Sequence, residues 1–185
     1  MNGSTRAHQS VRCVGRGIVL GHDCELLRDV RLETLSREGE QIRIGNGCRI
    51  KMNVWMCSYG GGVALGSNVL VGPNSVLHGH GRISIGNDTM LGPGVVITAA
   101  DHAYWSPERE LSSRGFVRAP ITIGKNVWIG AGSVITANSQ IGDDVVVGAG
   151  SVVTGTLASG AVYGGVPAKK IKDIVRESRG VVEHW

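Results

Sequence analysis

Aromatic residues are scarce in this sequence of 185 residues: they make up 4% of the chain, and one of them is phenylalanine. This scarcity excludes a core filled mainly by large rings. No run approaches the roughly 18 apolar residues of a transmembrane helix. The polar first ten residues lack the apolar stretch of a secretory signal peptide. We therefore expect a cytoplasmic protein without a membrane span.

Metal-binding and nucleic-acid-binding patterns are also missing. The four cysteines form no C-x-x-C pair and have no histidine-rich segment beside them, so we predict reduced, packed thiols and no metal. The net charge of +4 comes from scattered lysines and arginines. Because a nucleic-acid surface clusters its basic residues and offers aromatic rings for stacking, we predict no nucleic-acid partner.

Glycine, in contrast, is abundant, at 29 of 185 residues, and it belongs to a six-residue period. From Ile123 to Val153 every sixth residue is a branched aliphatic residue, and glycine or threonine follows each of them. The same unit starts again at Leu20, Ile44 and Leu65. A run of six such positions would arise by chance on the order of once in a few thousand trials.

A unit of six residues is long enough for one short strand and a corner. Three units close a triangular coil, and such coils stack at about 4.8 Å with the aliphatic residues inside and glycine at the corners. We therefore predict an all-β fold, a parallel β-helix, within a single domain of residues 1–185. The regular repeat should cover residues 41–170, after less regular first coils in residues 1–40.

The period is interrupted twice. Residues 103–120 carry charges, rings and proline without a repeat, which predicts a loop excursion out of the coil. Residues 171–185 also lack the repeat. A short C-terminal helix from Lys170 to Ser178 would place Ile171, Ile174 and Val175 on one face and could cap the solenoid.

Three segments carry a family resemblance: NVWIGA (126–131), VVGAGSVVT (146–154) and GVPAK (165–169). They resemble the hexapeptide-repeat acyltransferases, particularly the galactoside, maltose and nodulation-factor acetyltransferases, and are similar to capsule and exopolysaccharide O-acetyltransferases. The resemblance covers roughly residues 60–172. It implies a left-handed β-helix, a homotrimer with active sites between subunits, and acetyl-CoA bound along a groove between adjacent coils.

The resemblance also implies a histidine base at the end of a coil, just before an extended loop. Asp101 and His102 stand at that place. A hydroxyl or amine must lose a proton as it attacks a thioester, and an imidazole with a pKa near its usual value of about 6.5 can accept that proton. We predict that His102 is the general base of a direct transfer, without a covalent enzyme intermediate.

By the same resemblance, seven residues should bind acetyl-CoA: Gly130, Ala131, Ala149, Thr154, Pro167, Lys169 and Lys172. A backbone N–H of the Gly130–Ala131 segment should stabilise the oxyanion. The family often has lysine directly after the threonine, whereas this chain has Gly155. Either a phosphate contact is missing, or Lys170 replaces it.

The residues expected to bind the acceptor are Asn74, His78, His80, Asp101 and Trp128. The two histidines could also be ordinary surface residues, and Trp128 a packing residue. The resemblance therefore implies transfer of acetyl from acetyl-CoA to a hydroxyl of a saccharide, either a small molecule or an oligosaccharide such as a surface-polysaccharide precursor.

Three alternatives remain at this point. The first is N-acetylation of an amino sugar or an antibiotic. The second is a non-catalytic β-helix scaffold. The third, a γ-class carbonic anhydrase, needs an H-x-x-x-x-H pair that this sequence lacks.

Overall fold

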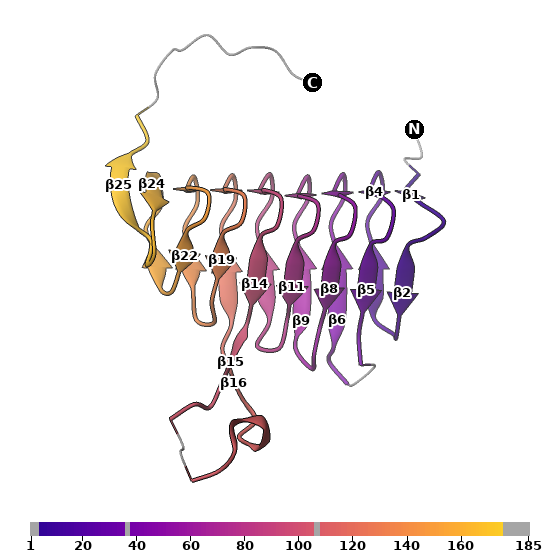
Figure 1. Cartoon of the computed structure of the whole chain (residues 1–185). Coiled ribbons are helices and arrows are strands. Elements are labelled where there is room, and N and C mark those ends of the chain that lie inside the picture. Colours follow the sequence, from indigo (N-terminus) through magenta and orange to yellow (C-terminus); the bar gives the residue numbers. More distant parts are fainter. Residues whose placement is uncertain (1–3, 36–37, 106–107, 176–185) are drawn as a thin grey trace.

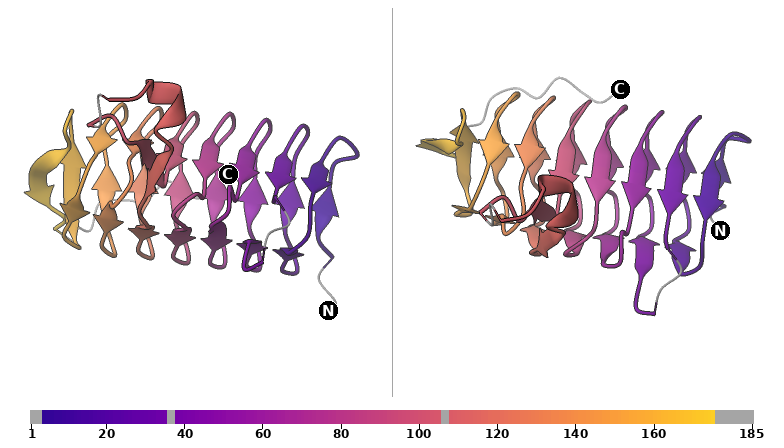
Figure 2. Two further views of the ribbon diagram at one scale, coloured as in Figure 1. Left: turned by 90° about the horizontal axis from the view of Figure 1, so that it is seen from below. Right: turned by 60° about the horizontal axis from the view of Figure 1, so that its bottom comes forward.

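The computed structural model describes residues 4–35, 38–105 and 108–175, which form one solenoid of seven stacked coils (Figure 1). Each coil gives one short strand to each of three sheets, and neighbouring coils pair in parallel. The fold is the predicted left-handed parallel β-helix. Figure 2 shows the coils following one another along a single axis.

We name the three sheets A, B and C in the order in which each coil visits them. Sheet A contains β1 (Arg6–Ala7), β4 (Glu25–Leu26), β7 (Arg49–Ile50), β10 (Leu70–Val71), β13 (Met90–Leu91), β18 (Trp128–Ile129), β21 (Val146–Val147), β24 (Ala161–Gly164) and β25 (Lys169–Asp173). Sheet B contains β2 (Arg12–Val14), β5 (Arg31–Glu33), β8 (Trp55–Cys57), β11 (Val76–His78), β14 (Val96–Thr98), β19 (Val134–Ile135) and β22 (Val152–Val153). Sheet C contains β3 (Ile18–Leu20), β6 (Gln41–Ile44), β9 (Gly62–Leu65), β12 (Ile83–Ile85), β17 (Ile121–Ile123), β20 (Gln140–Ile141) and β23 (Thr156–Leu157).

The six-residue period places one aliphatic ladder inside each sheet. Ile129, Ile135 and Ile141 lie in sheets A, B and C of a single coil, and none is more than 3% exposed. Register pairing continues each ladder into the next coil, as Ile135 pairs with Val153. Removing these side chains from water is the main stabilising contribution of the core.

The corners between strands explain the glycine content and the asparagines. Nine of the eleven described non-glycine residues with positive φ are asparagine or aspartate, which tolerate the left-handed conformation. Neighbouring corners also stack, since the Asn53 side-chain amide donates to Asn74 Oδ1 at 3.2 Å. A Cβ on Gly130 would lie 2.4 Å from the backbone nitrogen of Ala149, so only glycine fits between these two coils.

The first coil is paired as the later ones are. β1, β2 and β3 pair in parallel with β4, β5 and β6 of the second coil. The longer interval between Leu20 and Ile44 lies in the connection between β5 and β6. The described strands before residue 40 therefore pair as those of the regular repeat do, and the extra residues fall between β5 and β6.

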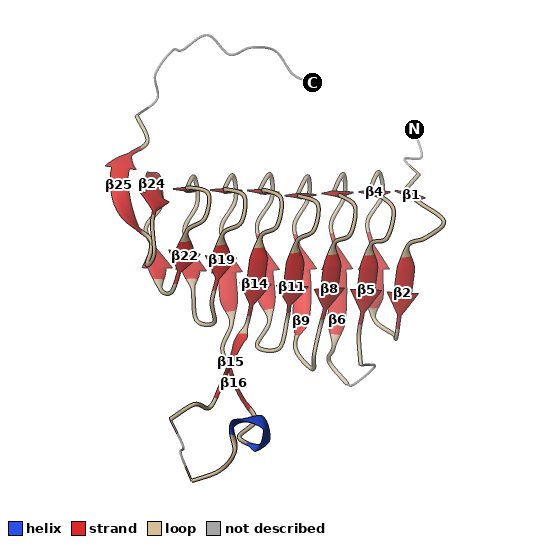
Figure 3. Cartoon of the chain, viewed as in Figure 1, coloured by secondary structure: helices blue, strands red, loops and turns tan. Residues whose placement is uncertain are grey.

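A β-hairpin leaves the solenoid between sheets B and C. β15 (Ala100–His102) pairs antiparallel with β16 (Phe116–Arg118), and the tip holds the short 3₁₀ helix η1 (Leu111–Ser113) (Figure 3). The excursion predicted for residues 103–120 therefore begins three residues earlier, at Ala100. His102 lies on the hairpin itself.

The predicted helix from Lys170 to Ser178 is wrong where the structure describes it. Lys169–Asp173 form β25, which pairs antiparallel with β24, while residues 176–178 lie outside the described part. The last parallel strand of sheet A would otherwise expose unpaired N–H and C=O groups. Pairing with that edge outweighs the weak helix preference of a short segment. The described part of the chain contains no helix of the length and hydrophobicity needed to cross a membrane.

Candidate active site

His102 lies on β15 at the base of the hairpin, opposite Phe116 on β16. The two ring centroids are 4.4 Å apart, and both side chains are exposed. Within the described residues, neither imidazole nitrogen of His102 has a hydrogen-bond partner. Asp101 precedes it on the same strand and is also exposed. Because successive side chains of a strand point to opposite faces, Asp101 does not orient the imidazole.

Phe116 joins His102 to a continuous group of rings on sheet B. Its centroid lies 5.1 Å from that of His80, which stacks on Tyr59 at 4.3 Å with an interplanar angle of 12°. Tyr59 contacts His78 at 4.9 Å. Trp55 contacts His78 at 4.8 Å. We call these six residues the ring cluster: Trp55, Tyr59, His78, His80, His102 and Phe116.

The fold brings His78, His80 and His102 together, although the hairpin separates His102 from the coil. Sequence reasoning missed Trp55, Tyr59 and Phe116. The position of Trp55 could have been predicted from the repeat. Trp55 lies one coil before β11, the strand that carries His78, so the two residues belong to neighbouring strands of one sheet. Phe116 gave no such signal, since its contacts depend on how the hairpin folds back.

Two of the three histidines in the ring cluster, His78 and His80, have lowered pKa values. Burial lowers the pKa of His78. Burial also lowers the pKa of His80, with further contributions from His78 and from the positive charge of Arg118. Two of their nitrogens, His78 Nε2 and His80 Nδ1, are buried without a hydrogen-bond partner in the described part of the chain. The neutral imidazole is therefore the form that this surface favours.

This shift predicts how stability depends on pH. The folded chain binds fewer protons at His78 and His80 than the unfolded chain, so the free energy of unfolding should fall as the pH falls through about 6.5. Urea unfolding between pH 7.5 and 5.0 measures this slope. The double variant His78→Gln/His80→Gln should flatten the slope. His8→Gln, at an exposed histidine of the first coil, should keep it; equal slopes in all three proteins would contradict the prediction.

Two other residues expected to bind the acceptor lie elsewhere. Asn74 occupies the corner between β10 and β11. Trp128 lies on β18 in sheet A and is 52% exposed. It lines a groove there together with Met90, Val146 and Ile174. Within one chain, neither residue belongs to the ring cluster.

The residues expected to bind acetyl-CoA lie on several sides of the C-terminal coils. Ala131 and Ala149 are exposed at stacked corners between sheets A and B. The Gly130 N–H donates to the Val147 carbonyl at 2.7 Å, so it is already occupied. Within the described residues the Ala131 N–H has no such partner. The N–H donor expected in this segment is therefore that of Ala131.

The remaining cofactor candidates are exposed as well. Thr154 follows β22 at the corner between sheets B and C, Pro167 lies in the turn before β25, and Lys169 and Lys172 lie on β25.

Lys170 and Gly155, the position where the family often has a phosphate-binding lysine, lie apart. Gly155 is at the corner between β22 and β23, whereas Lys170 pairs with Tyr163 in sheet A and makes a 2.6 Å ion pair with Asp173. Lys170 therefore does not occupy the place of the missing lysine.

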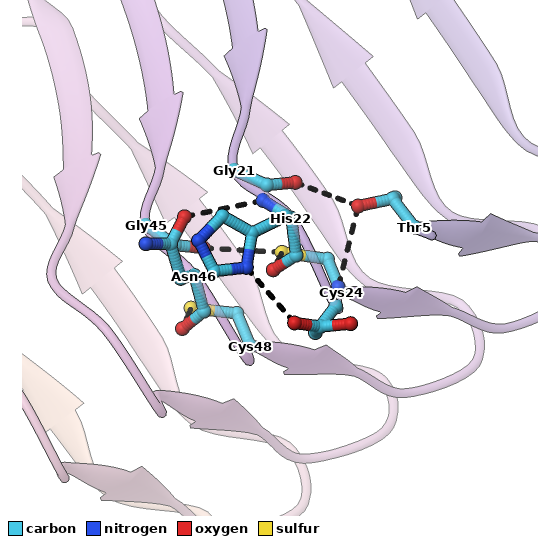
Figure 4. Close-up of polar contacts among 8 residues, drawn as sticks. Thr5, Gly21, His22, Cys24, Gly45, Asn46 and Cys48 are labelled. Atoms are coloured by element: carbon cyan, nitrogen blue, oxygen red, sulfur yellow. Dashed lines mark hydrogen bonds and ion pairs between the residues drawn. The ribbon is translucent and has the colours of Figure 1, made fainter. Parts of the chain in front are cut away.

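Three of the four cysteines are buried: Cys24, Cys48 and Cys57. The expectation of a packed thiol is wrong for Cys13, which is exposed on β2. Figure 4 shows Cys24 and Cys48 on adjacent coils. The Cys24 thiol donates to the Gly45 carbonyl and the Cys48 thiol to the Gly66 carbonyl, each at 3.1 Å. Burial raises the pKa of Cys48 to about 11. Over the part of the chain that the structure describes, no group of three or more metal-ligating side chains is close enough to hold a metal ion.

Comparisons with known proteins agree with this architecture. Residues 120–155 match the family described as Bacterial transferase hexapeptide (six repeats), and residues 62–99 match Hexapeptide repeat of succinyl-transferase. A candidate lipopolysaccharide biosynthesis O-acetyl transferase of Escherichia coli is 30% identical over 160 residues, which cover 82% of each chain.

Nodulation protein L of Rhizobium meliloti is 41% identical over 79 residues, or 43% of this chain, and the match spans 42% of that protein. Among solved structures, a variant of AntD, an N-acyltransferase from Bacillus cereus, superimposes with a TM-score of 0.71 at 25% identity. The superposition covers 85% of this chain and 84% of AntD. That structure contains dTDP-4-amino-4,6-dideoxyglucose and coenzyme A.

Proposed function

The chain belongs to the hexapeptide-repeat acyltransferase family, and from that premise we propose that it transfers acetyl from acetyl-CoA to a hydroxyl of a saccharide. The observation that carries the proposal is His102 itself: an exposed imidazole on a β-hairpin, with both nitrogens free of hydrogen-bond partners in the described structure and the other rings of the cluster beside it. A non-catalytic scaffold has no need of such a residue.

In this mechanism His102 takes the proton from the acceptor hydroxyl as its oxygen attacks the thioester carbonyl. The C–O bond forms, and the carbonyl oxygen becomes an oxyanion that accepts a hydrogen bond from the Ala131 N–H. The C–S bond then breaks, and the proton passes from His102 to the departing thiolate. Positioning both substrates side by side supplies proximity without a covalent enzyme intermediate.

The placement of these two groups supports an active site between subunits, as in the homotrimer that the family resemblance implies. His102 stands at the corner between sheets B and C, whereas Ala131 stands at the corner between sheets A and B. The full width of sheet B separates them within one chain. If the Ala131 corner of a second copy faces the hairpin, base and oxyanion donor meet between subunits. Acetyl-CoA would then lie along the C-terminal coils, with Thr154 beside the pantetheine arm and Lys169 and Lys172 at the phosphates.

Transfer to the amine of an amino sugar is the second candidate, because AntD binds an amino sugar nucleotide. The two reactions separate in one experiment. Thiol release from acetyl-CoA is followed with neutral saccharides (glucose, maltose, galactosides) and with glucosamine, and the products are treated with mild alkali, which cleaves esters but not amides. Ester products support the proposal, whereas amide products alone would replace it with N-acetylation. If no acceptor leads to thiol release, the proposal that the chain is an acetyltransferase is rejected.

Placing a lysine at Gly155, in the corner between β22 and β23, should increase the affinity for CoA. Lysine placed there would meet no atom within 4 Å of its Cβ and would add a positive charge beside the expected phosphates. Because exposed ion pairs contribute about 0.2–1 kcal/mol, Gly155→Lys should tighten CoA binding by up to about fivefold at low salt. Calorimetry measures this, with the uncharged Gly155→Gln as control. Equal affinity of the two variants would place the phosphates elsewhere.

A further inference from the structure

The ring cluster extends much further than one acceptor hydroxyl requires. His102 leaves the coil of β14, while His78 lies on β11 and Trp55 on β8, each one coil closer to the N-terminus. Beyond Trp55, the ion pair between Arg31 and Glu33 lies on β5. Two coil spacings of about 4.8 Å separate the coil of His102 from that of Trp55, and a third spacing reaches the ion pair. The rings and the ion pair together therefore span about 14 Å, more than a single pyranose ring can cover.

Tyr59 is held in a costly conformation at the middle of this surface. Among the described residues, Tyr59 (φ 45°) and Arg82 (φ 85°) are the two with positive φ that are neither glycine, asparagine nor aspartate. A bulky side chain in this region costs on the order of 1–3 kcal/mol, and such strain gathers at functional sites. The Tyr59 ring in this backbone conformation stacks on His80, with an interplanar angle of 12°.

Polar groups border the rings along the same line. Trp55 Nε1 donates to Glu33 Oε2 at 2.9 Å, and the Arg31 guanidinium lies 5.6 Å from the centre of the Trp55 ring. At the other border, Arg118 of β16 packs over Gly60. A carboxylate and two guanidinium groups can bond hydroxyls on either side of the stacked rings.

We propose that the outer face of sheet B, from His102 to Trp55, binds an oligosaccharide of at least two sugar rings, whose reacting ring lies at His102. This inference rests on the proposed function and adds the acceptor's length and direction. A pyranose has an apolar C–H face and a rim of hydroxyls, which match aromatic rings bordered by polar groups. Neutral imidazoles suit such uncharged hydroxyls better than they suit an anionic partner.

The test compares kcat/KM for acetylation of glucose, maltose and maltotetraose, and of N-acetylglucosamine, chitobiose and chitotetraose. In one of the two series, kcat/KM for the tetrasaccharide should exceed kcat/KM for the monosaccharide at least tenfold. Two variants remove a ring: Tyr59→Asn, which keeps a residue suited to positive φ, and Trp55→Leu, which keeps apolar volume. Each should lower the tetrasaccharide-to-monosaccharide ratio about tenfold, while Val19→Ala on the outer face of sheet C should not.

The outcomes separate the two hypotheses. Turnover of monosaccharides and tetrasaccharides at equal kcat/KM, or an equal loss on both in the ring variants, would overturn the extended surface and leave the proposed function intact. A change of oligomeric mass in Trp55→Leu by light scattering would also overturn it, because the surface would then be an interface between copies. Absence of turnover with every saccharide would reject the proposed function and this inference together.

Discussion

Replacing His102 with alanine should lower kcat about 100- to 10,000-fold, the range that general-base catalysis supplies. The imidazole is exposed, touches one ring and makes no hydrogen bond within the described structure, so its loss removes little packing. Surface changes of this kind alter the free energy of unfolding by no more than about 0.5 kcal/mol. The loss should therefore appear in the chemical step.

Two measurements identify the base in this experiment. CoA affinity by calorimetry should be unchanged, because the expected cofactor residues lie on the C-terminal coils. The values of kcat and kcat/KM should fall by the same factor in His102→Ala, because the base acts in the transition state and not in substrate binding. His22→Ala, at an exposed histidine of the second coil, serves as the matched control. A kcat for His102→Ala within tenfold of wild type would remove His102 from the mechanism.

The solenoid was predictable because each coil repeats the same contact. Ile129, Ile135 and Ile141 enter three different sheets, yet all three are buried in the same way. The six-residue period of the sequence is therefore sufficient to predict the stacked coils. The repeat did not predict the conformation of the segment that follows the last coil, where a helix was expected and β25 forms. Nothing in the sequence around Lys170 shows that β24 leaves an open edge, and that edge decides its conformation.

The candidate site was only partly predictable for a related reason. His78 and His80 belong to a coil, so their distance from Trp55 follows from coil length. Phe116 belongs to the hairpin, and its position between His80 and His102 depends on the pairing of β15 with β16. The occupied N–H of Gly130 likewise depends on the neighbouring coil and is invisible in the sequence.

Gly81→Ala should lower kcat although Gly81 is not itself a residue of the candidate active site, because the substitution should displace the hairpin that carries His102. Gly81 packs against the root of the hairpin, where the Ala119 N–H donates to the Ala99 carbonyl at 3.2 Å. A Cβ on Gly81 would lie 2.5 Å from that carbonyl oxygen and 2.5 Å from the nitrogen and oxygen of Ala119. Because these are backbone atoms, the added methyl group must push the hairpin away from the coil.

The expected result is a loss of about 1–3 kcal/mol in the free energy of unfolding, typical of overpacking. A displacement of about 1 Å of a catalytic group can cost 100-fold in rate, so kcat should fall by about that factor. Gly155→Ala is the matched control: its Cβ would meet nothing within 4 Å, and it should keep stability or raise it by up to about 1 kcal/mol. Urea unfolding and thiol release measure both quantities.

The comparison of Gly81→Ala with His102→Ala then tests whether the hairpin is held rigidly. A destabilised Gly81→Ala enzyme with wild-type kcat would mean that the hairpin finds its catalytic position through contacts other than its root, such as those with a second copy. A large loss of kcat at unchanged CoA affinity would instead show that the coil positions the base directly. In that case the close approach of Gly81 to the hairpin root is what gives His102 a fixed place beside the rings of sheet B.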